Sequence, residues 1–183
     1  MALYRPIPRR KFFQVAAAAA LAGGVLGACS GRNGPWRFLT ADEAALVESI
    51  SARIIPEDQD PGGRTAGVVN FIDIQLTGPY KRYQEIYRQG LARLEKTSLA
   101  LFQKSWAGLP FEDQTTLLSN IEKGEAPKEI WDTVTPAGFF DLLCEHCLQG
   151  YYGSPRHGGN RNYASYRMIG IDYPQLCGRR QPA

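Results

Sequence analysis

The sequence of 183 residues predicts an all-α fold, a single small bundle of about five helices followed by a structured C-terminal loop rich in glycine and tyrosine. Apolar residues recur every three or four positions along most of the chain, which is the period of an amphipathic helix. Proline, glycine and capping residues separate the periodic segments. No segment alternates apolar and polar residues convincingly, as a half-buried strand would, so the pattern favours a bundle.

The first helix is predicted to begin after Thr40, because residues 40–43 (TADE) have the pattern of a capping box. In this motif the Thr hydroxyl and the Glu carboxylate bind backbone N–H groups that the first turn leaves free. Pro56 ends the helix. Its apolar positions at helical spacing are Leu46, Val47, Ile50 and Ile54.

Four more helices follow in the same way. A second is predicted over residues 68–76 and ends at a Thr-Gly-Pro sequence, and the longest runs from 80 to about 102. A shorter one spans 111–121, with acidic residues at its start, where they favour the helix dipole. The fifth begins at Thr135-Pro136, a cap followed by the proline common in a first turn, and continues to about Tyr151.

The N-terminus has the pattern of an export signal. Arg9, Arg10 and Phe12 precede an apolar segment, residues 15–26, that is too short to span a bilayer of about 30 Å. The paired arginines and the alanine-rich segment are typical of a twin-arginine (Tat) signal. Cys29 follows Leu-Gly-Ala, which predicts either a lipidation site or ordinary cleavage nearby. We therefore expect a signal at 1–29, a linker at 30–38 and a helical domain at 39–183, in a periplasmic protein.

The charge of the chain argues against a nucleic-acid partner. Removal of the residues before Cys29 takes away four basic residues and no acidic one, which lowers the formal net charge from +3 to −1. The remainder has no clustered basic face of the kind that binds a phosphate backbone.

The sequence CEHC at residues 144–147 is the only cysteine pair at metal or redox spacing. A redox protein or a metal site using Cys144, His146 and Cys147 is one hypothesis, although one helix cannot direct all three at one ion. The other hypothesis is a disulfide, within the chain or to another subunit, among Cys144, Cys147 and Cys177. No Ser-His-Asp set and no phosphate-binding glycine loop can be assigned, so we expect no catalytic residue, metal site or cofactor site in this chain.

Residues 150–163 combine glycines with aromatic and basic residues, a composition that does not suit an ordinary helix. Tyrosine and arginine are enriched where proteins bind one another, so this segment is a candidate partner interface. The alternative is a closing loop that only covers one end of the bundle. The candidate contact residues are Tyr151, Tyr152, Arg156, His157, Asn160, Arg161, Tyr163 and Tyr166.

The chain resembles the gluconate 2-dehydrogenase subunit 3 family over most of its mature part. The resemblance is carried by residues 38–43 (FLTADE), 53–58 (RIIPED), 66–73 (AGVVNFID), 150–161 and 166–170 (YRMIG), and the N-terminal signal is also similar to that of the family.

The resemblance implies a non-catalytic small (gamma) subunit of a membrane-bound, FAD-dependent sugar or sugar-acid dehydrogenase. Its implied partners are a large flavoprotein of the glucose-methanol-choline type, a cytochrome c subunit with haem c, and the Tat translocon that exports the folded flavoprotein with it. The complex or a lipid anchor would hold the chain at the cytoplasmic membrane. The competing hypotheses are a free-standing periplasmic redox or metal protein and an unrelated lipoprotein anchor or binding module.

Overall fold

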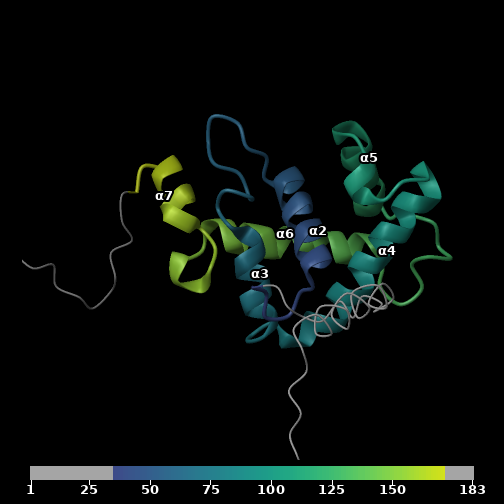
Figure 1. Cartoon of the computed structure of the whole chain (residues 1–183), viewed down its shortest axis with the longest axis horizontal. Coiled ribbons are helices and arrows are strands. Elements are labelled where there is room, and N and C mark those ends of the chain that lie inside the picture. Colours follow the sequence, from purple (N-terminus) through teal and green to yellow (C-terminus); the bar gives the residue numbers. More distant parts are fainter. Residues whose placement is uncertain (1–34, 172–183) are drawn as a thin grey trace, which may run out of the picture. The chain divides into compact units, whose positions relative to one another are not determined.

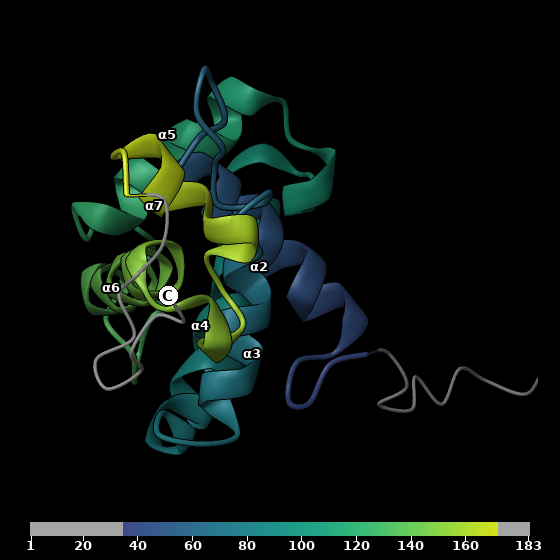
Figure 2. The same ribbon diagram turned by 90° about the vertical axis from the view of Figure 1, so that its left-hand side faces the viewer.

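The computed structural model describes residues 35–171, and every regular element in this range is helical. The prediction of an all-α bundle is therefore confirmed. Figure 1 shows the arrangement, with α6 running behind α2 and α3, and Figure 2 shows it turned by 90°. The α-helices are α2 (Ala41–Ile54), α3 (Val68–Leu76), α4 (Gln84–Phe102), α5 (Phe111–Glu122), α6 (Pro136–Tyr152) and α7 (Ala164–Met168).

Helix α2 begins as its capping box predicts. The Glu43 amide donates to the Thr40 hydroxyl at 3.2 Å, and the Thr40 amide donates to the Glu43 carboxylate at 2.8 Å. The same carboxylate binds the Arg88 guanidinium of α4, whose other nitrogen donates to the Phe38 carbonyl at 2.7 Å. The cap thus ties the start of α2 to α4 as well as starting the helix.

Helix α6 lies at the centre of the bundle and packs against α2, α3, α4, α5 and α7. The Thr135 hydroxyl caps it by accepting from the Gly138 amide, and Pro136 follows the cap. Phe139 and Leu143 are fully buried along its length. At Gly90 of α4 there is no room for a side chain, because an added Cβ would lie 2.3 Å from the Phe139 ring.

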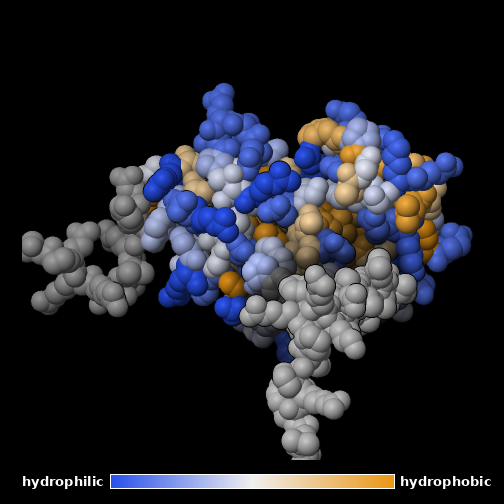
Figure 3. Space-filling model, in the orientation of Figure 1, coloured by the Kyte–Doolittle hydropathy of each residue, from blue (hydrophilic) through white to orange (hydrophobic). Residues whose placement is uncertain are grey.

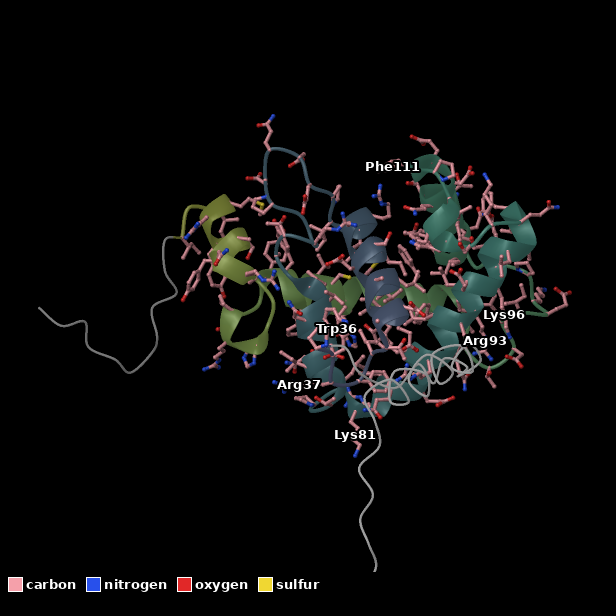
Figure 4. The ribbon with its side chains drawn as sticks, in the orientation of Figure 1. Trp36, Arg37, Lys81, Arg93, Lys96 and Phe111 are labelled. Carbon is pink, nitrogen blue, oxygen red and sulfur yellow. The ribbon has the colours of Figure 1, made fainter. Side chains whose placement is uncertain are left out.

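A buried carboxylate holds the start of the folded region. Asp73 of α3 is 2% exposed and accepts from three backbone amides, those of Arg37, Phe38 and Leu39, at 2.7, 2.9 and 2.9 Å. Figure 4 shows Trp36 and Arg37 beside α3. Residues 37 and 38, which the sequence assigns to the linker, are therefore bound to the bundle.

The structure differs from the prediction at two places. Residues Lys81–Tyr83 form a 3₁₀ turn, η1, so that α4 begins at Gln84 rather than at residue 80. The reason is that the Tyr80 amide still bonds to Gln75 at the end of α3. The C-terminal segment contains two 3₁₀ turns, η3 (Pro155–His157) and η4 (Arg161–Tyr163), and then α7, which the sequence does not predict.

Among the described residues, no helix combines the length and the apolar character that a transmembrane span requires.

Replacing Asp73 with Asn tests how much the buried carboxylate contributes. The side chain keeps its size, but one acceptor oxygen becomes an NH₂ group that cannot accept from a backbone N–H. We expect the free energy of unfolding, measured by urea denaturation, to fall by about 2 kcal/mol. The control is Asp141→Asn on the exposed face of α6, which should change stability by less than about 0.5 kcal/mol. Equal stability of the two variants would contradict a structural role for Asp73.

Candidate functional site

The C-terminal segment, residues 153–168, is held in a defined shape by Asn160. This residue is fully buried, and its φ of 43° places it in the left-handed region. Its side-chain Nδ2 donates to the Gly153 carbonyl at 2.9 Å, and its side-chain Oδ1 accepts from the Ser165 backbone amide at 3.0 Å. Its backbone N–H donates to the Gly150 carbonyl at 2.8 Å. One side chain therefore connects the end of α6 to the beginning of α7.

Two further contacts fix the segment against the bundle. The Arg161 amide donates to the Ala66 carbonyl, just before α3, at 2.9 Å. Gly159 lies against the end of α6 so closely that a Cβ there would be 2.1 Å from the Gly150 carbonyl oxygen. The predicted structured loop is therefore a folded extension of the bundle.

The structure separates the candidate contact residues into two groups. Tyr151 is 2% exposed and its hydroxyl donates to the Pro61 carbonyl at 2.5 Å, and Asn160 is the buried residue described above. Neither side chain faces outwards, so both are corrected to internal, structural residues. Half-buried or exposed side chains remain at Tyr152, Arg156, His157, Arg161, Tyr163 and Tyr166.

His146 lies inside an aromatic cluster. Its ring stacks on Tyr80 with 4.3 Å between centroids, and the Tyr87 hydroxyl is 2.9 Å from its Nδ1 atom. Burial lowers the pKa of His146 to about 4, because the charged imidazolium would lose its hydration. Burial also raises the pKa of Tyr87 well above its ordinary value. Both groups are therefore neutral at pH 7 and fill the space between α4 and α6.

The two cysteines of α6 have the properties of structural residues. Neither forms a disulfide within residues 35–171; Cys147 is buried and Cys144 is half-buried. Burial raises the pKa of Cys144 to about 11 and that of Cys147 further. A thiol that remains protonated at pH 7 is a weak nucleophile and a poor metal ligand. Within residues 35–171, no group of three or more His, Cys, Asp or Glu side chains is placed to hold a metal ion.

Several predicted residues lie outside the described part of the chain. They are Arg9, Arg10 and Phe12 of the export signal, Cys29 and Cys177. The signal, the lipidation site and a disulfide that includes Cys177 therefore stay predictions.

One residue of the C-terminal surface was not among the predicted contacts. Arg167 of α7 is exposed and lines the same groove as Arg161. The sequence holds one signal for it, since residues 146–171 contain three arginines and no Asp or Glu. That signal concerns charge along the chain and does not say which arginines come together.

The neutral state of His146 predicts a specific pH dependence. The folded-state pKa of about 4 lies below the ordinary value of 6.5, so the unfolded chain takes up the proton first as the pH falls. The contribution of neutral His146 to the free energy of unfolding is therefore fully present above pH 6.5. It decreases as the pH falls, by about 2 kcal/mol between pH 6.5 and about 5. Urea denaturation at several pH values should show this loss in the wild type and in His157→Gln, but not in His146→Gln. A loss of the same size in His146→Gln would contradict the assignment.

The comparisons with known proteins agree with the resemblance seen in the sequence. A family model described as "Gluconate 2-dehydrogenase subunit 3" matches residues 41–172, which includes every helix from α2 to α7. The searches of curated proteins and of solved structures gave no match. Because the matched residues make up well over half of the sequence, the chain belongs to the gluconate 2-dehydrogenase subunit 3 family.

Proposed function

We propose that this chain is the non-catalytic small subunit of a membrane-associated, FAD-dependent dehydrogenase complex that oxidises gluconate or a related sugar or sugar acid. The observation that carries the proposal is the family match over residues 41–172. In this proposal the chemistry belongs to a large FAD-dependent subunit of the glucose-methanol-choline type. A cytochrome c subunit with haem c receives the electrons.

The interior of the bundle supports a structural role. Histidine and cysteine, which often carry out chemistry in proteins, serve in packing here. His146 is stacked between tyrosines, and Cys147 is buried with a raised thiol pKa. Exposed side chains at the end of α6 and in the C-terminal segment, such as Tyr152 and Arg161, are the features that suit contact with another subunit.

The second part of the proposal is that the chain escorts the flavoprotein out of the cytoplasm. The Tat route, which the sequence signal at Arg9 and Arg10 indicates, transports proteins that have already folded with their cofactors. A flavoprotein without a signal of its own could cross the membrane while bound to this chain. The mature complex would then lie in the periplasm, attached to the cytoplasmic membrane through the cytochrome subunit or through a lipid on Cys29.

Purification of the tagged chain from its native host tests the subunit assignment. Gentle extraction from membranes should yield a large partner, and the sample should show the absorption of an oxidised flavin, with haem bands when the cytochrome remains bound. The purified sample should also oxidise gluconate or a sugar with an artificial electron acceptor. A solitary chain with bound metal, or with a dithiol that titrates, would contradict the proposal and favour a free-standing redox or metal protein.

Replacement of both Arg9 and Arg10 with Lys tests the escort role. The pair is the part of the signal that the Tat pattern requires, so the double variant should leave dehydrogenase activity in the cytoplasm. We expect activity in the periplasmic and membrane fractions to fall at least about tenfold. Arg5→Lys is the matched control and should export normally. Unchanged export of the flavoprotein by the double variant would rule out the escort role.

A further inference from the structure

A groove of about 410 Å³ separates the loop that follows α2 from the C-terminal segment. One wall is formed by residues of the loop, the other by η4 and α7. Figure 3 shows that hydrophilic residues predominate at the end of the molecule where α7 lies. The lining residues are Asp60, Pro61 and Thr65 on one side and Arg161, Asn162, Ala164, Arg167 and Met168 on the other.

Within residues 35–171, the guanidinium groups of Arg161 and Arg167 have no polar partner. Both residues are exposed, and among the described residues neither side chain takes part in a hydrogen bond or an ion pair. The Arg161 guanidinium lies beside Gly67, where an added Cβ would be 3.3 Å from its Nε and Nη2 atoms. Other arginines of the bundle are paired, for example Arg64 with Glu48 at 3.6 Å.

The positive charges of the groove lie together on the wall formed by η4 and α7. Asp60 is the single acidic residue of the lining. Glu57 of the same loop lies beside the groove, since its carboxylate accepts from the hydroxyl of the lining residue Thr65 at 2.6 Å and from the Thr65 amide at 2.9 Å. The segment 146–171 has no acidic residue to oppose its three arginines. The wall formed by η4 and α7 therefore carries two positive charges and no negative one, and the acidic residues belong to the loop opposite.

The backbone that carries the two arginines is well anchored. Arg161 follows the buried Asn160, and its own amide is bonded to Ala66. At the other end, the Tyr151 hydroxyl of α6 lies 3.5 Å from the sulfur of Met168, next to Arg167. Because this backbone is already ordered, binding a carboxylate through the planar fork of an arginine costs side-chain freedom but no further ordering of the chain. Ile169 and Ile171, which are 53% and 45% exposed, add apolar surface close by in the chain.

We propose that this groove is a docking site for an acidic segment of the partner subunit, with Asp or Glu carboxylates bound by Arg161 and Arg167. The identity of the partner rests on the proposed function. The chemistry of the site is independent of that function, because it rests on two guanidinium groups without a partner among the described residues, carried by an anchored backbone.

The first experiment uses the complex. Arg161→Glu/Arg167→Glu should lower the amount of flavin that co-purifies with the tagged chain by about tenfold or more, because like charges then face one another. The matched control is Lys123→Glu/Lys128→Glu, an equal reversal of charge at exposed positions beyond the end of α5, and it should keep the flavoprotein. Retention of the flavoprotein by the arginine variant would overturn the proposal.

The second experiment uses the isolated full chain and a fluorescent oligoglutamate peptide as the probe. Fluorescence anisotropy should show binding that weakens with added salt, that the arginine variant loses and that the lysine control keeps. Peptide binding in this assay together with a wild-type chain that brings down no flavoprotein would contradict the proposed function but support the groove. Absence of peptide binding, equal binding by wild type and arginine variant, or binding of anionic vesicles in place of the peptide would overturn the groove assignment.

Discussion

The geometry of this protein depends on the lack of a side chain at Gly150, near the end of α6. A Cβ at this position would lie 3.0 Å from the Phe71 ring, so glycine lets α3 approach α6 closely. On the same residue, the carbonyl oxygen accepts from the Asn160 amide, and Gly159 packs against it. The core and the C-terminal segment are thus joined at one backbone position. Packing in the bundle and the placement of the exposed arginines are consequences of the same close approach.

Most of the helices could be predicted because their signals are local. The Thr40 capping box and the Thr135-Pro136 start each involve residues within one turn, and both are present in the structure. The C-terminal segment could not be predicted in the same detail, because its shape depends on contacts between distant residues. The bond from Arg161 to Ala66 joins positions far apart in the chain, and the left-handed conformations of Asn162 and Tyr163 exist only with that support.

The candidate site shows where motif spacing and burial disagree. Residues 144–147 have the spacing of a metal or redox motif, but a helix turns these side chains in different directions and the bundle covers two of them. His146 is directed at Tyr87, and Cys147 enters the core. Sequence spacing is the same for a buried and an exposed pair, whereas the pKa of a thiol depends on its surroundings. The spacing therefore could not distinguish a structural role from a chemical one.

Paired polar groups of the bundle and the exposed arginines of the groove have different roles. Several polar groups that hold the bundle together are paired within the chain, as Asp73, Glu43 and Arg88 are, so they contribute to stability and leave little for a partner to bind. The backbone around Arg161 and Arg167 is anchored by hydrogen bonds, while their guanidinium groups have no hydrogen bond or ion pair among the described residues. Exposed charges of this kind add little to the stability of an isolated chain. A fold that anchors their backbone while leaving their charge unpaired is therefore better explained by recognition than by stability.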